Sequence, residues 1–285
     1  MMIDQYFEQI RSIVGQHFPA FETELVCVDI QNVYKAFYSE DSPPHVVNVK
    51  GDLPNLAPPW PLAWYEHRSI EPGTKQAYGI LFGCADPNTD RTLALSLKRE
   101  FPDVNFARMK WLVRYFFFFE IKTLKECIFA FSGTDALDAD GESLLGDVFF
   151  YQPSELLLKH PEPDSALVNL YPAMMAISFL HCKNVSVQEG DPKTKIHKKR
   201  AKKSKQPFFR FKTLDIQPMK EVLRNEGGLQ EHGLKMALHI CRGHFKDYRN
   251  GRGLFGKVKG LFWWDMHKRG DDSEGIIHKD YRVDV

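Results

Sequence analysis

The chain has 285 residues, 43% of them hydrophobic and 26% charged, with a formal net charge of +1, and these proportions exclude a largely disordered protein. Its five cysteines are scattered and never spaced as C-x-x-C, which argues against a disulfide framework and predicts a reducing, cytoplasmic setting. Acidic residues stand where a secretory signal would be basic, and the most apolar stretch, residues 111–121, is too short to cross a bilayer, so we expect neither export nor a membrane partner.

The N-terminal part is predicted to form a sheet with few helices. Apolar residues at helical spacing predict an amphipathic helix over residues 3–14. Residues 135–146 are expected to be a loop, and the apolar residues 165–181 a largely buried helix. Turn residues separate six runs that are typical of strands, at residues 25–37, 46–49, 62–66, 77–82, 106–120 and 124–131.

A basic segment then separates this part from a second strand-rich region. Residues 191–205 contain eight Lys or Arg and almost no apolar residue, which predicts an exposed arm that contacts a polyanion. A Lys-rich connection that only faces solvent is the alternative. After the arm, four further runs predict an antiparallel sheet, at residues 208–216, 236–248, 260–267 and 276–283.

We therefore expect an α+β fold of mainly antiparallel sheets with a few helices. The expected organisation is an acidic scaffold over residues 1–189, a basic arm over 190–206 and a basic sheet region over 207–285, with one integrated domain as the alternative. Residues 190–285 contain 23 Lys and Arg against 12 Asp and Glu, which leaves 15 and 25 of the totals of 38 and 37 for residues 1–189. This asymmetry predicts that the C-terminal part faces a polyanion, or else that the two parts simply attract one another.

The densest chemistry lies in residues 238–270 and the strand that follows. Two histidines with nearby cations suit metal-independent RNA cleavage, in which one group removes the 2′-hydroxyl proton, another protonates the leaving 5′-oxygen, and cations stabilise the charge on phosphorus. We predict that His244 and His267 are the acid and base, that Arg242 binds the phosphate, and that Tyr281 positions it or donates a proton. Further phosphate contacts are predicted at Lys198, Lys199, Arg200, Lys202, Lys203, Arg249, Arg252, Lys257, Arg269 and Lys279. The alternative is that the histidines are ordinary half-buried sheet residues bonded to neighbours.

The same region permits other assignments. His239, Cys241, His244, His267 and the pair His181-Cys182 offer zinc ligands, but their spacing matches no familiar finger or ribbon, so we expect no metal and no other cofactor. The glycine-rich loop around residues 251–256 lacks the Gly-Lys-Ser/Thr ending of a nucleotide-binding P-loop and is expected to contact phosphate only as a hairpin loop. One of the two rings of Trp263-Trp264 could stack a base while the other packs in the core. Glu66, among aromatics, is expected to be a structural carboxylate whose pKa burial raises.

Three sequence blocks that span most of the chain carry a likeness to a known group. They are residues 55–60 (NLAPPW) with Glu66, residues 181–185 (HCKNV), and residues 239–270 with HxCRGHF, LFG, WW and a closing RG. The chain thereby resembles a family of uncharacterised proteins from bacteriophages, prophages and other mobile regions of bacterial genomes. That resemblance implies a bacterial, mobile-element setting and brings no established activity. The C-terminal part also resembles ribonuclease toxins of the RelE type, by analogy only.

The sequence therefore predicts a nucleic-acid-directed protein of phage or mobile-element type. The favoured hypothesis is a metal-independent endoribonuclease of the toxin or host-interference class, acting on RNA rather than DNA, with an antitoxin or another protein as a further partner. The alternatives are a non-catalytic module that binds nucleic acid or an acidic protein, and a zinc-stabilised interaction module.

Overall fold

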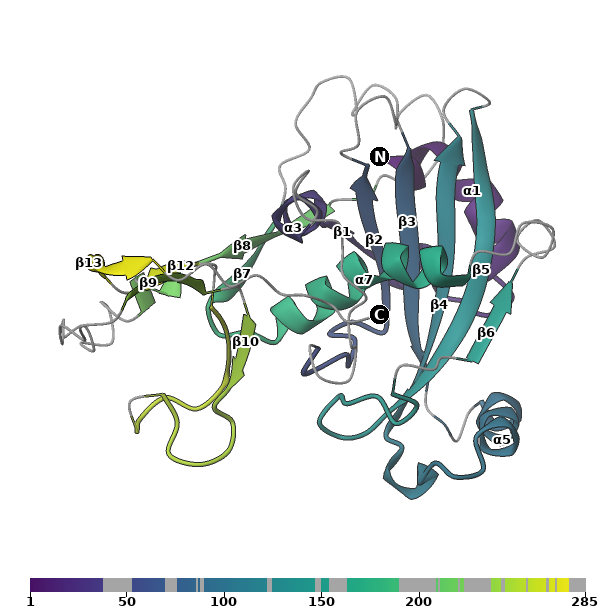
Figure 1. Cartoon of the computed structure of the whole chain (residues 1–285). Coiled ribbons are helices and arrows are strands. Elements are labelled where there is room, and N and C mark those ends of the chain that lie inside the picture. The colour runs from purple at the N-terminus through teal and green to yellow at the C-terminus, as the bar shows by residue number, and fades with distance from the viewer. Residues whose placement is uncertain are drawn as a thin grey trace. The chain divides into compact units, whose positions relative to one another are not determined.

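A computed structural model of the chain is shown in Figure 1. It describes residues 1–37, 53–69, 76–85, 87, 90–121, 125–146, 150–153, 163–189, 209, 211–219, 221–222, 237–241, 244–254, 256–264, 267–269 and 271–276. The chain forms two compact units. The first joins residues Met1–His181 to Val187–Asp215, and the second joins Cys182–Ser186 to Ile216–Val285.

The larger sheet has eight strands in the order β6-β5-β4-β3-β2-β1-β8-β7. The strands from β2 to β6 pair antiparallel, whereas β1 is parallel to both β2 and β8. The predicted α+β class with mainly antiparallel pairing is thus confirmed. The strands are β1 (Val26–Asp29), β2 (Leu62–Arg68), β3 (Ala77–Ala85), β4 (Trp111–Ile121), β5 (Glu126–Leu137), β6 (Phe150–Pro153), β7 (Val185–Glu189) and β8 (Phe211–Ile216).

Helix α1 (Met2–Val14) covers one face of this sheet (Figure 1). Its apolar side chains recur at helical spacing and are buried against every second residue of β2, β3 and β4, because alternate strand residues share a face. The predicted helix is confirmed. The residues that form this interface include Ile3, Phe7, Ile10 and Val14 of α1, with Trp64, Leu81, Phe116 and Phe118 of the sheet.

A buried carboxylate holds the start of α1. Glu66 of β2, 1% exposed, accepts hydrogen bonds from the amide of Met2 at 2.7 Å and from the indole Nε1 of Trp64 at 3.1 Å. Burial raises the pKa of Glu66, and the bonds from Met2 and Trp64 act in the opposite direction. Because the first amides of a helix have no partner inside the helix, a carboxylate at this end satisfies them and favours the helix dipole. Glu66 has the structural role that its aromatic surroundings predicted.

Helix α7 (Pro163–Leu180) crosses the opposite face of the sheet (Figure 1). Residues 172–179 are all buried, as the continuous apolar sequence predicted, and Pro172 lies inside the helix. The hydroxyl of Ser178 donates to the carbonyl of Asn55 at 2.9 Å, and the amide of Leu56 donates to the carbonyl of Gly141 at 2.8 Å. The NLAPPW segment is thereby fixed between α7 and the loop after β5.

Stacked rings run across the α7 face of the sheet. Tyr34 of α3 (Gln31–Phe37) stacks on His67 at 4.3 Å between ring centroids, and His67 stacks on Tyr78 at 5.1 Å. The row continues from Tyr78 to Phe117 at 5.9 Å and from Phe117 to Phe131 at 5.0 Å. Each of the four strands from β2 to β5 contributes one ring, so this aromatic row couples the strands through their side chains as well as their backbones.

A small cluster of helices packs against the start of β4 and the end of β5, where Leu112 and Ala136 are buried. Helix α5 (Arg91–Glu100) begins at Asp90, whose carboxylate accepts from the amide of Leu93 at 3.3 Å in the manner of an N-cap. Its buried Leu97 packs with Phe106 of the 3₁₀ helix η1 (Phe106–Arg108). Helix α5 was not predicted, because Leu93, Leu95 and Leu97 recur at every second position and do not give a helical spacing. A further short helix is α2 (Phe21–Glu24).

Several predictions of strands and loops were wrong in part; residues 106–108, for example, form η1 and not the start of a strand. Residues 25–37 form β1 followed by α3, because the carboxylate of Asp29 accepts from the amide of Gln31 at 2.9 Å and turns the chain into a helix. Residues 135–137, predicted as loop, continue β5. Strand β8, assigned to the C-terminal sheet, pairs instead with β1. The predicted strand at residues 46–49 lies outside the described residues.

The second unit contains two small sheets. Strands β10 (His244–Asp247) and β11 (Leu261–Trp264) form an antiparallel pair, and β9 (Ala237–Cys241) lies between β12 (His267–Arg269) and β13 (Asp271–Ile276). β9 is antiparallel to β12 but parallel to β13, so the expectation of an entirely antiparallel C-terminal sheet was wrong for that pair. Within the described residues of both units, every helix is too short or too polar to span a membrane.

Candidate nucleic-acid interface

The two small ladders of the second unit share one register. His244 pairs with Trp264 in β10–β11, and His267 pairs with Cys241 in β12–β9. Cys241 precedes His244 by three residues, and its partner His267 follows Trp264, the partner of His244, by three residues. The two ladders therefore keep the same register. Each ladder places one of the two predicted catalytic histidines on a paired strand of this unit.

A buried asparagine anchors the returning strand. Asn184, 2% exposed, accepts from the amide of Trp263 at 2.9 Å through Oδ1 and donates to the Trp263 carbonyl at 2.8 Å through Nδ2. The same Nδ2 donates to the carbonyl of Gln217 at 3.0 Å, and the amide of Gln217 donates to the Asn184 carbonyl at 2.8 Å. An asparagine amide that replaces strand hydrogen bonds on both sides fixes the position of β11. The HCKNV block thus has a structural role in this unit.

The loop between β10 and β11 is held by its own hydrogen bonds. The amide of Tyr248 donates to the carbonyl of Gly260 at 2.9 Å, and a second turn is closed between Leu254 and Val258 by bonds of 2.7 and 3.0 Å. Gly253 has a φ of +81°, and a Cβ there would lie 2.8 Å from the carbonyl oxygen of Val258. Only glycine combines that backbone conformation with so close an approach, so the loop has a defined shape.

This loop carries exposed cations. Arg252, Lys257 and Lys259 are all exposed, and among the described residues the side chain of none of the three forms an ion pair or other polar contact. Residues 244–264 contain five Lys or Arg against one acidic residue. A loop of defined shape loses less conformational entropy than a mobile loop when its unpaired cations bind phosphates.

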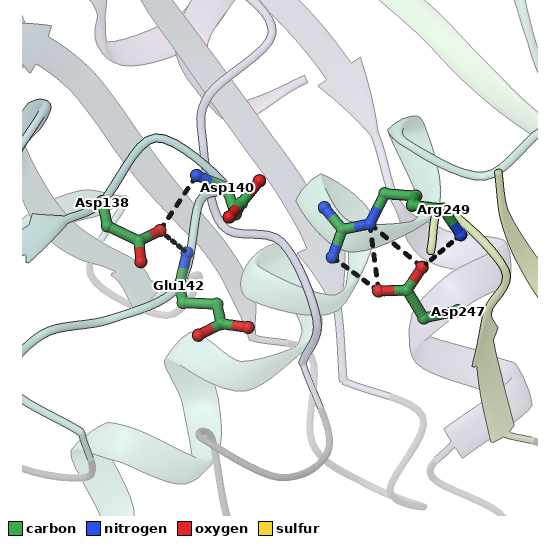
Figure 2. Close-up of polar contacts among 5 residues, drawn as sticks. All are labelled: Asp138, Asp140, Glu142, Asp247 and Arg249. Atoms are coloured by element: carbon green, nitrogen blue, oxygen red, sulfur yellow. Dashed lines mark hydrogen bonds and ion pairs between the residues drawn. The ribbon is translucent and has the colours of Figure 1, made fainter. Parts of the chain in front are cut away.

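Two other cations at the base of the loop are already engaged. Asp247 accepts from Nε and Nη2 of Arg249, the latter at 2.7 Å, and from the Arg249 amide at 2.8 Å, as Figure 2 shows. Hydrogen bonds from Arg249 lower the pKa of Asp247. The ammonium of Lys246 lies 4.3 Å from the ring centroid of Trp264, a cation–π contact. Arg249, predicted as a phosphate contact, forms an ion pair with Asp247 in the structure.

The paired tryptophans divide as alternation predicted. Trp263 is 5% exposed and packs edge-on against Phe245 at 4.8 Å, whereas Trp264 is half-buried beside Lys246. Phe262 lies in a small core with Met219 and Leu254. Of the aromatic residues on β11, Trp264 is therefore the one whose ring is combined with a cation at a partly open position.

The predicted catalytic and arm residues are only partly described. For His244, His267 and Arg269 the structure gives the strand register, with Arg269 opposite His239, and their side chains lie outside the described residues. The other predicted residues that lie outside the described ranges are Arg242, Tyr281, Lys279, Lys198, Lys199, Arg200, Lys202 and Lys203. The contributions of Lys246, Lys259 and Asn184 were not predicted; the Lys-x-Lys spacing before Gly260 was the available signal for Lys259.

The proposed zinc ligands can be examined at His181 and Cys182. The Nε2 atom of His181 lies 2.7 Å from the carbonyl oxygen of Ala57, which can only accept, so Nε2 carries a proton. Burial raises the pKa of the Cys182 thiol well above its usual range, so this cysteine is a protonated thiol at neutral pH. No group of three metal-ligating side chains occurs among the residues whose side chains are described, a set that excludes His239 and Cys241.

Two aspartates of the first unit, Asp135 and Asp138, are buried. Asp138 accepts from the amides of Asp140 at 2.9 Å and Glu142 at 3.1 Å (Figure 2), and it also pairs with Arg108. Asp135 is 4% exposed and accepts from the Ser143 hydroxyl at 2.9 Å. Its Oδ2 has no hydrogen-bond partner among the described residues, and burial raises its pKa to about 7. Sequence patterning gave no sign of this buried acid.

Comparisons of the chain with protein-family models, with curated proteins and with solved structures gave no match. The assignment of a function therefore rests on the geometry and charge of the second unit.

Proposed function

We propose that the protein binds nucleic acid through the loop between β10 and β11, and that RNA is its preferred ligand. The observation that carries the proposal is the set of exposed, unpaired cations, Arg252, Lys257 and Lys259, on a loop fixed by its own hydrogen bonds. Each phosphate neutralised by such a cation releases counterions, which favours binding to any strand. The sequence of the basic arm at residues 191–205 contains eight further cations, which suit the same class of ligand.

A part-open tryptophan favours a single strand over a duplex. Trp264 is half-buried, and Lys246 lies over its ring at 4.3 Å. Proteins that bind single-stranded RNA combine cations with aromatic rings on which unpaired bases stack. Because His244 lies directly opposite Trp264 in the β10–β11 ladder, a base stacked on Trp264 would bring its backbone close to that predicted catalytic histidine.

The binding proposal is tested by removing the three loop cations together. We expect the variant Arg252→Gln, Lys257→Gln, Lys259→Gln to bind a labelled RNA 20-mer on the order of 10- to 100-fold more weakly and to reduce the slope of log K against log salt by about 2. The matched control is Lys98→Gln, Arg99→Gln, Lys110→Gln, which removes three exposed cations from the first unit. Equal salt slopes for both triple variants would contradict the proposal.

RNA cleavage is a second proposal on the same surface. His244 and His267 lie on β10 and β12, opposite Trp264 and Cys241 respectively. Metal-independent cleavage needs two groups that exchange protons with one phosphodiester, and imidazoles suit both roles. We propose metal-independent cleavage with these histidines as acid and base. The resemblance of the sequence blocks to mobile-element proteins adds a setting, namely interference with a bacterial host by a toxin that an antitoxin restrains.

Cleavage is tested with end-labelled RNA in EDTA. The expected result is cutting by the wild type, loss of cutting in His244→Ala, and unchanged cutting in His45→Ala, a histidine outside the segment. RNA that is retarded by all three proteins and cut by none would remove the enzyme proposal and leave the binding proposal standing.

A further inference from the structure

A polar cavity lies on the α1 face of the large sheet, far along the sequence from the basic loop. Its volume is about 230 Å³, which corresponds to roughly seven water molecules at liquid density. It lies over β4 and β5. His17, which follows α1, and Leu93, in the first turn of α5, also line it. The lining residues are His17, Leu93, Arg114, Phe116, Ser132, Gly133 and Thr134.

The alternation of β4 explains why the cavity is polar. Leu112, Phe116 and Phe118 lie on the same face of the strand as Arg114 and are buried under α1 or α5. Two charged residues, Arg114 and Glu120, lie on this face of β4, and Glu120 accepts a hydrogen bond from Tyr6 of α1. Arg114 stands between apolar neighbours, at a position where an apolar residue would extend the core. Placing a guanidinium there costs desolvation energy, and the small residues opposite, Thr134 across from Arg114 and Ser132 across from Phe116, leave the space above it open.

Arg114 has more donors than the protein uses. One of its Nη atoms is 2.8 Å from Nδ1 of His17, and the other donates to a carboxylate oxygen of Asp90 at 2.5 Å. A guanidinium has five N–H donors, and among the described residues the remaining three have no acceptor, including the buried Nε. Such unused donors on a buried cation are costly unless an acceptor reaches them.

Two hydroxyls that face the cavity can also donate, whereas His17 accepts from Arg114. Arg114 can only donate, so Nδ1 of His17 must accept and the proton of the neutral ring lies on Nε2. Nε2 of His17 is 3.2 Å from Nε2 of Gln16, so the exposed Gln16 amide accepts this proton only when its oxygen takes the place of that nitrogen. Burial and the charge of Arg114 lower the pKa of His17, while Asp90 acts in the opposite direction. Among the described residues, the hydroxyls of Ser132 and Thr134 have no hydrogen-bond partner.

We propose that this cavity binds a small oxyanion, a phosphate or carboxylate group. The guanidinium of Arg114 and the hydroxyls of Ser132 and Thr134 would donate to it, with His17 at the rim. Asp90 offsets one positive charge, so the remaining attraction comes from the unused N–H groups, the hydroxyls and the N-terminal end of the ten-residue helix α5. The volume leaves room for a small organic group beside the anionic one.

The test is a titration of the full-length protein with inorganic phosphate and, separately, with acetate, at constant ionic strength. We expect saturable shifts of the His17 ring signals in NMR spectra, with a dissociation constant on the order of 0.1–1 mM for the preferred anion. Preference for phosphate or for acetate identifies the source of the oxyanion. No saturable shift with either anion up to about 20 mM would overturn the proposal.

Variants separate the cavity from general charge effects. Arg114→Met is expected to weaken anion binding about 10-fold or more, because it removes the charged donor. Thr134→Val keeps the shape of the side chain and removes only a hydroxyl, so it tests the site even if Arg114→Met does not fold; we expect about a 5-fold loss. The control is Arg99→Met at the exposed end of α5. Binding that is unchanged in Thr134→Val, or reduced equally in Arg99→Met, would overturn the proposal.

Discussion

The basic loop of the second unit and the cavity at Arg114 in the first unit use cations in opposite ways. On the loop, Arg252, Lys257 and Lys259 are exposed and unpaired among the described residues. In the cavity, Arg114 is about one-fifth exposed and already bonded to Asp90 and His17. Exposed cations cost little to maintain and bind weakly in a salt-dependent manner, whereas a buried cation is costly and selects the geometry of its partner. Position in the fold thus decides what a positive charge can recognise.

The largest expected effect comes from removing the support of the loop. Asn184→Ala deletes the hydrogen bonds that Asn184 makes to the backbone of Trp263 and Gln217, leaving buried backbone groups unpaired. We expect the second unit to lose about 3–5 kcal/mol of stability, measured by hydrogen exchange of the Trp263 amide. Asn250→Ala, at an exposed loop position, is the control. Unchanged exchange at Trp263 would show that β11 does not depend on Asn184.

The next effect is the pH dependence of the free energy of unfolding, to which two aspartates contribute with opposite sign. Burial raises the pKa of Asp135 from 3.8 to about 7, so between about pH 4 and pH 7 the unfolded chain has released a proton that the folded protein retains. The free energy of unfolding should therefore fall by about 2–4 kcal/mol as pH rises through this window. Asp247 behaves in the opposite sense, because Arg249 lowers its pKa; its stabilising contribution is present above the unfolded pKa and is lost as pH falls.

Asp135→Asn should remove the fall in the free energy of unfolding that the raised pKa of Asp135 causes as pH rises. Denaturant unfolding of the wild type and of this variant at pH 5 and pH 8 checks it, and the variant should gain stability relative to the wild type at pH 8. Parallel pH profiles for the two proteins would mean that Asp135 is not the group responsible.

A smaller loss of stability is expected when the carboxylate of either Asp–Arg pair, Asp90–Arg114 or Asp247–Arg249, is replaced. Asp90→Asn retains an N-cap for α5 but removes the counter-charge of Arg114, whose side chain is 21% exposed, so we expect a loss of about 1–2 kcal/mol. The same change at Asp247, whose partner Arg249 is 31% exposed, should cost below about 1 kcal/mol. Thermal unfolding of both variants is the measurement, and equal losses would contradict the distinction between the cavity and the loop.

The smallest expected effect concerns the shape of the loop. Gly256 has a φ of +72° with nothing within 4 Å of an added Cβ, so Gly256→Ala meets no clash and introduces only backbone strain of about 1 kcal/mol. At Gly253 the same change also meets the carbonyl of Val258. RNA affinity should fall more in Gly253→Ala than in Gly256→Ala. Equal affinities would indicate that loop shape does not contribute to binding.

The sequence predicted the elements whose signal is local and strong. Amphipathic spacing gave α1, continuous apolar character gave α7, and alternation separated buried Trp263 from half-buried Trp264. The turn from β1 into α3 was missed because it depends on one side-chain bond from Asp29. The pairing of β8 with β1 is a contact between distant segments, and no pattern within residues 208–216 distinguishes it from pairing with a nearer strand.

The candidate sites were predicted to different degrees. The exposed cations of the loop follow from composition and glycine spacing, so the position of the proposed interface follows from the sequence. The cavity at Arg114 could not, because it requires residues from α1, β4, β5 and α5 to meet. Its one sequence signal was an arginine inside the apolar run at residues 111–121. Such an interruption shows that a charge is buried without indicating which partners it has.

The aromatic row from Tyr34 through His67, Tyr78 and Phe117 to Phe131 has an optical consequence. Rings held at fixed angles in a chiral packing give circular dichroism in the near ultraviolet, which disappears when side-chain packing is lost. Two of the rings are tyrosines of the first unit. The tyrosine band should therefore report the packing of the large sheet, and a change in it would distinguish an altered sheet from a variant that affects only the loop.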